Sequence, residues 1–420
     1  MTNGDAEAGS FCHYPPRLAA DIDVTEQAEG GRTRYVVRSR AAARYFLLKP
    51  AEYGIFRRFD GARAPQEIAA GLGAEAGPRP SLQSLVRFLT KLDSLGLIAR
   101  GGGAAGAARG AAKPALGFYM KFPVFNPDRL LGRLDRRIGR ALGRPYVVAS
   151  FVVMALVAVL MSMRSAEVVA YAARIHAEYG LAVIMLFVVV ITVLHEVSHG
   201  LACKHFGGDV PETGVLLIFF LIPAFYCDVT DIHRLGRRRE RLWVIFAGIY
   251  FQLLAGALGA LLWLAAPPRT RLADLGFLIF FAGTLNVFVN CNPLIKLDGY
   301  YALSQLVGAQ NLQAYSSAYV RSLVRRWAGR EAEPPKGPRR PVLYVTYWAA
   351  SLAYTLFLIW LIVGWAGGWL IGRFGLTGKL LTLALIALFG ERLWRPALVR
   401  WSRLLGAKFR GRGRYAAAKL

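Results

Sequence analysis

Long apolar runs separated by short charged loops dominate the chain from residue 118 onward. A helix that crosses a bilayer needs about 20 predominantly apolar residues. Six runs approach this length, and Lys379 interrupts the last of them. The pattern predicts transmembrane helices over residues 145–163, 181–203, 242–266, 275–297, 342–366 and 374–391. The expected fold class is therefore a polytopic α-helical membrane protein.

One further apolar run, residues 215–226, is too short to cross a bilayer. It has 12 residues and contains Pro223. A re-entrant hairpin or an interfacial segment fits this length better than a span.

The first hundred residues follow a different pattern. Residues 33–48 favour two short strands, Pro50 suits a helix start, and Ser81 suits the cap of a later helix. Together with a helix near Pro65 and a closing strand at 97–100, this predicts a small α+β winged-helix domain. The predicted order is a tail (1–32), this domain (33–100), a Gly/Ala linker (101–117), a membrane domain (118–400) and a basic tail (401–420).

Composition supports a membrane protein and argues against a nucleic-acid partner. Of the 420 residues, 55% are hydrophobic and only 19% are charged, whereas soluble domains are about a quarter charged. A single-domain soluble enzyme is excluded. The net charge of +26 comes from basic residues that flank apolar segments, so no nucleic-acid partner is expected. The cysteines at 12, 203, 227 and 291 form no CxxC pair, which argues against disulfides and thiolate zinc sites.

Loop charges predict the orientation. Alternate loops carry seven, five, seven and nine Lys or Arg residues on one side, against two, two and one on the other. The positive-inside rule then places both termini in the cytoplasm with six spans. Residues 1–45 lack a basic start followed by an apolar core, so no signal peptide is expected.

The second predicted span contains His195-Glu196-Val197-Ser198-His199. On a helix, residues four apart share a face, so the two imidazoles can bind one zinc ion. Glu196 is then placed to take a proton from a water that zinc has made more acidic. Ionisable groups at membrane depth are costly and are a functional site by default. The alternative is a buried polar patch that helps helices pack.

A third zinc ligand is needed, and two residues compete for the role. His205 lies ten residues after His195, the spacing of the third ligand in the metzincin motif HExxHxxGxxH. However, Ala202 replaces the glycine of that motif, and a continuous helix carries His205 away from the metal. An interfacial histidine is its alternative reading. Asp298 lies near the end of the fourth span, at a depth similar to that of His195, about 21 Å along the second span. Its alternative reading is a helix cap or turn before Gly299.

Other polar residues near these motifs leave two readings open. Asn290 and Asn292 either bind an extended peptide or satisfy backbone groups freed by Pro293. Glu212 lies in a loop with no supporting motif.

HEVSHG, followed about 100 residues later by NPLIKLDGYYAL, resembles the site-2 protease family of intramembrane zinc metalloproteases. PVFNPDRLL and CDVTDIHRLGRRRERLWVIFAGIY extend the resemblance to bacterial peptide zinc metalloproteases. The resemblance implies that His195, His199 and Asp298 are the zinc ligands and Glu196 is the catalytic base. Many relatives have Ala-Gly-Pro and a following Asn in the third span. Here Ala247-Gly248-Ile249 and Gln252 stand instead.

Residues 33–100 resemble PqqD-like domains through LLKPAEYGIFRRFDGARAPQEIAAGL and LVRFLTKLDSLGLIAR. The resemblance implies that this domain binds a leader peptide as an added strand. A stability or partner domain is the alternative.

The prediction for the whole chain is a zinc-dependent intramembrane endopeptidase. Its expected substrate is a membrane-associated or ribosomally made peptide, or a transmembrane segment, and its expected location is a bacterial inner membrane. The alternative is a non-proteolytic, metal-bound membrane protein that binds peptide or assists export.

Overall fold

The computed structural model describes most of the chain, and within it helices predominate. Among the described residues, five helices are long and apolar enough to cross a membrane. Their length and composition support an integral membrane protein, as the apolar pattern predicts. The described residues are 15–29, 32–39, 44–71, 81–94, 97–99, 119–139, 143–218, 222–309, 311–329 and 340–416. The predicted linker at 101–117 lies outside them.

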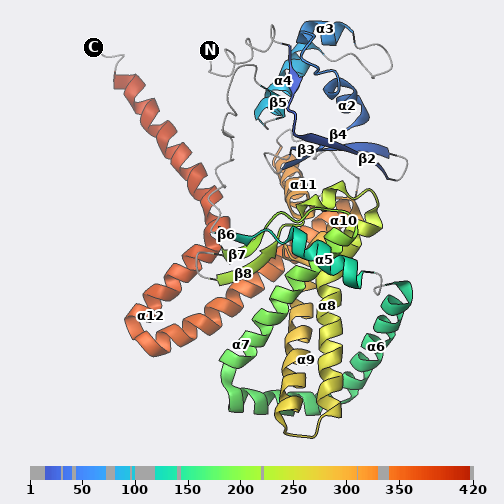
Figure 1. Cartoon of the computed structure of the whole chain (residues 1–420). Coiled ribbons are helices and arrows are strands. Elements are labelled where there is room, and N and C mark those ends of the chain that lie inside the picture. Colours follow the sequence, from blue (N-terminus) through green and yellow to red (C-terminus); the bar gives the residue numbers. More distant parts are fainter. Residues whose placement is uncertain are drawn as a thin grey trace. The chain divides into compact units, whose positions relative to one another are not determined.

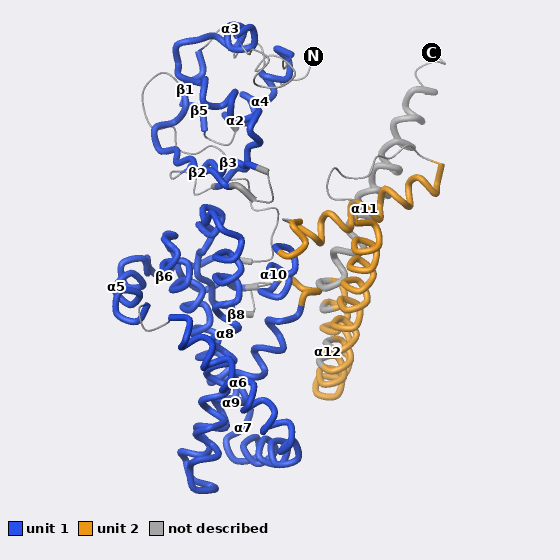
Figure 2. The backbone as a smooth tube through the Cα atoms, turned by 90° about the vertical axis from the view of Figure 1, so that its right-hand side faces the viewer, with its two compact units in different colours: residues 1–292, 297–305 blue, residues 293–296, 306–420 orange. Residues whose placement is uncertain are grey.

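Two compact units make up the chain (Figure 2). The first comprises residues 1–292 and 297–305, and the second comprises residues 293–296 and 306–420.

Short strands and three helices form the N-terminal part of the first unit. The strands are β1 (Arg17–Leu18), β2 (Ile22–Glu29), β3 (Arg32–Ser39), β4 (Arg44–Leu48) and β5 (Ile98–Ala99). The helices are α2 (Pro50–Phe56), α3 (Pro65–Ala70) and α4 (Leu82–Ser94). Strands β2, β3 and β4 form one antiparallel sheet in that order, and β1 pairs with β5.

Local sequence explains where α2 and α3 begin. Each starts with a proline, whose fixed φ suits the first turn. In each, a glutamate at the third position accepts a hydrogen bond from the backbone N–H that precedes the helix. The distances are 2.8 Å for Lys49 N to Glu52 and 3.1 Å for Ala64 N to Glu67. The apolar faces of α2, α3 and α4 share one core with β3, centred on Val37, Phe56, Phe59, Ile68, Leu85, Leu89 and Leu92.

Strand β2 lies inside the range expected to be a tail. It pairs with β3 along its whole length, from Ile22 with Ser39 to Glu29 with Arg32. Its sequence IDVTEQAE carries few apolar residues because β2 is an edge strand, so hydrophobic patterning did not reveal it.

The candidate spans are α6 (Arg144–Met163), α7 (Ser165–His205), α8 (Arg238–Ala265), α9 (Arg271–Asn290) and Pro341–Trp365, the first part of α12 (Pro341–Ala416). Gly180 interrupts α7 with a φ of 73°, a left-handed conformation that glycine adopts without strain. The part of α7 after Gly180 matches the span predicted over 181–203.

Helix α9 ends seven residues before the end predicted for the fourth span. Its last residue is Asn290, and Pro293 lies just beyond it. A proline has no N–H to donate and disfavours helical backbone in the residue before it, so the helix stops here. The predicted sixth span falls within α12, which breaks at Gly375, and it is not among the five candidates. A count of six spans stays a prediction.

Helices α8 and α9 pack closely because glycines face each other. A Cβ built on Gly259 would lie 2.6 Å from the backbone nitrogen of Phe280, and one on Gly276 would lie 2.5 Å from that of Trp263. Only glycine fits such an approach of two backbones. Around it, α6, α7, α8 and α9 share an apolar core that includes Met154, Ile175, Ala260, Trp263 and Phe277.

Another three-stranded antiparallel sheet lies at the end of α7 (Figure 1). It consists of β6 (Tyr119–Phe125), β7 (Thr213–Ile218) and β8 (Ile222–Cys227), in that order. The short apolar run 215–226 therefore forms most of a β-hairpin. Helix α5 (Asp128–Ile138), the 3₁₀ helix η2 (Thr230–Arg234) and α10 (Asp298–Val307) complete the first unit.

Hydrogen bonds and ion pairs join the N-terminal sheet to residues that follow α7. Arg38 of β3 lies 3.1 Å from Asp209 and 3.4 Å from Asp231. The hydroxyl of Tyr45 in β4 donates to Asp231 at 2.5 Å. Gln27 of β2 donates to the carbonyl oxygen of Leu235 at 3.1 Å. The N-terminal sheet is thus attached to the residues that follow α7 in the chain.

The second unit contains α11 (Leu312–Trp327) and α12. Tyr344 is buried between these helices, with its ring centroid 4.7 Å from that of Tyr315. Tyr347 and Ser351 of α12 donate to the carbonyl oxygens of Pro293 and Leu294, at 3.1 and 3.0 Å.

Candidate metal centre

Two histidines of α7 and the first residue of α10 meet inside the first unit. His195 and His199 lie one helical turn apart, and both are buried. Their Nε2 atoms are 3.0 Å apart. Oδ2 of Asp298 lies 3.1 Å from each of them. All three residues predicted as metal ligands are therefore brought together, although 99 positions of sequence separate His199 from Asp298.

The hydrogen bond of His199 fixes which of its ring nitrogens faces the other two groups. Its Nδ1 lies 2.7 Å from the carbonyl oxygen of Val244 in α8. A carbonyl oxygen only accepts, so Nδ1 carries the proton and donates it. In the neutral ring, Nε2 then presents a lone pair toward His195 and Asp298. Such a partner on the second nitrogen is typical of metal-binding histidines.

The three facing atoms fit a metal ion of the size of zinc. Tetrahedral zinc with bonds of about 2.0 to 2.1 Å keeps its ligand atoms about 3.3 Å apart. The observed edges of 3.0 to 3.1 Å are close to that spacing. Three acceptor atoms this close would repel one another without a cation or a proton between them. The chemistry of the set, two imidazoles and a carboxylate, suits zinc.

Electrostatics keep Asp298 ready to act as a ligand. Burial raises the pKa of this carboxyl, but hydrogen bonds and positive charge from the two imidazoles, when protons rather than a metal ion lie between the three groups, outweigh burial and lower the pKa to about 2. The side chain is therefore an ionised carboxylate at neutral pH. Gly299 follows it because a Cβ there would lie 2.3 Å from the carbonyl oxygen of Cys291. The turn that presents Asp298 thus depends on a glycine.

Glu196 lies beside the three ligand residues and is held from the sheet. Its Oε2 accepts a hydrogen bond of 3.1 Å from the backbone N–H of Cys227, the last residue of β8. The side chain is half-buried, whereas both histidines are buried. An acid adjacent to a metal site, oriented by one donor and still accessible, suits a general base.

Sequence reasoning did not identify three parts of this site. These are the Val244 carbonyl, the Cys227 N–H and the close approach of Gly248. A Cβ on Gly248 would lie 2.4 Å from His195 and 2.6 Å from Nε2 of His199. The Val244 carbonyl and the Cys227 N–H are backbone groups, which no side-chain pattern reveals. Gly248 belongs to the Ala247-Gly248-Ile249 run, which stands where many members of the resembled family have Ala-Gly-Pro. This run is the sequence feature that points to Gly248.

The other candidate residues lie outside the triad. His205 pairs with Asp135 of α5 at 2.8 Å and does not join His195. Glu212 lies 3.9 Å from Lys121 and accepts a hydrogen bond from Tyr226. The amide of Asn290 points toward Gln252, 3.4 Å away, and not toward the metal ligands.

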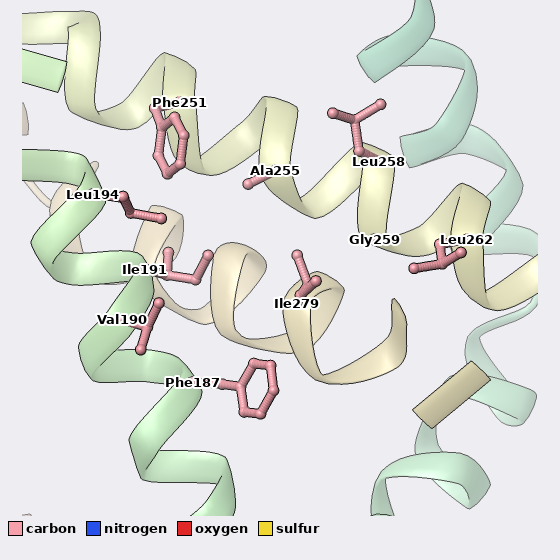
Figure 3. A pocket seen from close by; sticks show the side chains of 10 residues that line it. All are labelled: Phe187, Val190, Ile191, Leu194, Phe251, Ala255, Leu258, Gly259, Leu262 and Ile279. Atoms are coloured by element: carbon pink, nitrogen blue, oxygen red, sulfur yellow. The ribbon is translucent and has the colours of Figure 1, made fainter. Parts of the chain in front are cut away.

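An apolar groove is lined by the ten residues that Figure 3 shows. It lies among α7, α8 and α9 and has a volume of about 360 Å³. Leu194, one of its lining residues, directly precedes His195. On α8, the small residues Ala255 and Gly259 form part of the lining. The remaining lining residues are Phe187, Val190, Ile191, Phe251, Leu258, Leu262 and Ile279. Its lining is almost entirely apolar, so the groove suits an apolar group.

Comparison with known proteins gives one distant relative. Over 121 residues the chain is 26% identical to the "Putative peptide zinc metalloprotease protein YydH" of Bacillus subtilis (strain 168). The match covers 29% of this chain and 46% of that protein, so the chain spans about half the length of the relative. No family model and no solved structure matches the chain. The similarity supports a distant relationship to a zinc metalloprotease-like protein.

Proposed function

We propose that this chain is a zinc-dependent endopeptidase of the site-2 protease type that cleaves a peptide bond within or beside the membrane. The observation that carries the proposal is the cluster of His195, His199 and Asp298 beside Glu196 on a membrane helix. The distant zinc metalloprotease-like relative agrees with it.

The metal would be held by Nε2 of His195, Nε2 of His199 and the carboxylate of Asp298. Three protein ligands leave one position open, which is typical of catalytic rather than structural zinc. When bound, zinc polarises a carbonyl group and makes water more acidic. The Val244 carbonyl keeps the His199 ring oriented for this role.

Glu196 would move the proton. Water adds to the peptide carbonyl carbon, and Glu196 accepts the proton that this water loses. The C–N bond then breaks, and Glu196 passes the proton to the leaving amine. The Cys227 N–H holds one carboxylate oxygen, which leaves the other free to exchange the proton.

The surroundings support an apolar substrate. The groove that Leu194 helps to line suits apolar groups and would hold the apolar part of a membrane-associated peptide or transmembrane segment.

We also propose that the N-terminal domain resembling PqqD-like proteins binds a leader peptide as an added strand. Within the described residues, β2 and β4 are the outer strands of their sheet, and a free strand edge can accept a peptide. Its attachment to Asp209 and Asp231, close in sequence to α7, suits delivery of peptide to the metal site. A bacterial inner membrane is the location proposed from the family resemblance, and the loop charges place both termini in the cytoplasm.

Replacement of Glu196 by glutamine tests the activity. Membranes from cells that produce wild-type or Glu196→Gln protein would be compared by labelling and sequencing new peptide amino termini. We expect new termini only with the wild type, and equal zinc content in both proteins. Glu178→Gln, the same change in the same helix at an ion pair with Arg174, should cleave normally.

Two results would count against the proposal. Identical new termini in the Glu196→Gln sample would remove Glu196 from catalysis. Full biological activity of that variant without any cleavage would favour a non-proteolytic, peptide-binding or export accessory.

A further inference from the structure

Helix α5 has one face that is locked onto the end of the metal-site helix. Asp128 pairs with Lys204 of α7 at 2.7 Å, and Asp135 pairs with His205 at 2.8 Å. Between these contacts Leu131 is buried in a small core with Cys203 and Val210. Both acidic residues of α5 therefore point inward, toward the residues that follow His199 in α7.

The opposite face of α5 is basic and exposed. It carries four arginines, Arg129, Arg133, Arg136 and Arg137. Among the residues that the structure describes, none of the four has a carboxylate within ion-pair distance. Leu130 lies among them with 57% of its surface exposed. A helix with this division of charge has a concentrated positive surface that no carboxylate of the described residues neutralises.

Two independent connections place this surface at the membrane boundary. Residues 139–143 alone separate α5 from the span α6, and five residues reach at most about 17 Å. The partners of the inward face, Lys204 and His205, are the last residues of the span α7. Figure 1 shows α5 beside the ends of α7 and α8.

We propose that the outward face of α5 binds the anionic headgroups of the surrounding phospholipids. Guanidinium groups match phosphate oxygens with two parallel hydrogen bonds, and basic residues next to a span are attracted to anionic lipid. Leu130 contributes an apolar contact below the headgroups. Because the inward face is tied to α7, lipid bound at α5 is held on the same piece of structure as His195 and His199. This inference does not depend on the proposed peptidase activity.

Spin-labelled phosphatidylglycerol in phosphatidylcholine bilayers tests the proposal on the full-length protein. Electron paramagnetic resonance measures the fraction of probe that the protein immobilises, relative to spin-labelled phosphatidylcholine. We expect a preference for the anionic probe that declines as salt is raised. Changing Arg129, Arg133, Arg136 and Arg137 to glutamine should lower that preference by about two-fold or more. Changing the same four to lysine should retain most of it.

A second set of four substitutions serves as the matched control, because the whole chain is basic. Lys49→Gln, Arg57→Gln, Arg63→Gln and Arg87→Gln remove the same charge from exposed positions of the N-terminal domain. They should leave the lipid preference near the wild-type value. An equal loss in this control would show diffuse attraction, and no loss in the α5 variant would show that α5 does not bind lipid. Either result overturns the proposal.

Discussion

Gly248 of α8 lies so close to His195 that a methyl group at this position would come within 2.4 Å of the imidazole ring. The same methyl group would lie 2.6 Å from Nε2 of His199. Non-bonded carbon and nitrogen atoms need more than 3 Å, so the glycine lets α8 close over both rings. This contact explains how one backbone helps to set the position of two side chains on another helix.

Gly248→Ala should therefore weaken metal binding. The added methyl would push both rings away from Asp298, and we expect zinc affinity to fall by about ten-fold or more, with cleavage falling in parallel. Zinc content after dialysis against a chelator, measured by mass spectrometry, gives the result.

Gly256→Ala is the matched control on the same helix. A Cβ there meets its nearest neighbour at 3.7 Å, an ordinary contact, so zinc binding should be unchanged. If Gly248→Ala kept the wild-type affinity, the close approach would have no role in the site.

Asp298→Ala should reduce bound zinc well below one ion per chain. Two imidazoles alone form an incomplete site, and the third ligand contributes strongly to affinity. The comparison is the zinc content of purified wild-type and variant protein, with His205→Ala beside them. Zinc retained in Asp298→Ala would assign the third ligand to another residue, while His205→Ala should bind zinc normally because His205 pairs with Asp135.

The three candidate ligand residues could be predicted from the sequence because each leaves a local signal. His195 and His199 follow the four-residue repeat of a helix face, and Asp298 follows a break in an apolar run. The contacts that hold them depend on packing between helices. Val244 acts through its carbonyl oxygen, which every residue possesses, so no sequence pattern distinguishes it.

The differences in the fold have similar physical causes. Strand β2 is polar because it lies at a sheet edge, so hydrophobic periodicity placed it in a tail. The fourth span was extended to residue 297 because apolar residues continue past Pro293, whereas backbone chemistry ends the helix at Asn290. Apolar content predicts which residues avoid water. It does not predict where a helix ends, because the end depends on backbone hydrogen bonding and on proline.

Tyr45→Phe should loosen the attachment of the N-terminal sheet. Asp231 is 1% exposed and accepts a hydrogen bond from the Tyr45 hydroxyl at 2.5 Å. Loss of that donor from a buried carboxylate should cost about 1 to 3 kcal/mol. Hydrogen–deuterium exchange should become faster in β4 and η2. Tyr35→Phe is the control, because no hydrogen bond involves the Tyr35 hydroxyl among the described residues, and exchange there should not change.

Acid should weaken the same attachment through Asp209. Burial raises the pKa of this carboxyl, but Arg38 and Lys204 outweigh burial and lower the pKa from its usual value of 3.8. A carboxyl with a lowered pKa stabilises the folded state above its usual pKa, and that contribution disappears as pH falls through the lowered value. Exchange in β3 should therefore accelerate below about pH 3.8 in the wild type. Asp209→Asn should be faster already at neutral pH and less sensitive to acid, and equal pH profiles would contradict this account.

A polar cluster centred on Asp274 lies at the first turn of α9 and has a structural role. Asp274, 4% exposed, accepts hydrogen bonds from Tyr171 at 2.8 Å and Tyr179 at 2.7 Å. It also pairs with Arg174. These contacts join the first turn of α9 to the part of α7 that precedes the break at Gly180.

Asp274→Ala should lower the melting temperature and leave zinc binding intact. The change leaves two tyrosine hydroxyls without their acceptor and removes one of the two carboxylate partners of Arg174, which is partly exposed and keeps Glu178, so we expect a loss of about 2 kcal/mol. Asp274→Asn, which keeps one acceptor oxygen, should lose less. Glu167→Ala removes an exposed acid from α7, the helix that carries the partners of Asp274, and should hardly change the melting temperature. A simultaneous loss of zinc in Asp274→Ala would mean that this cluster also positions the segment with His195 and His199, because the partners of Asp274 and the two histidines all lie in α7.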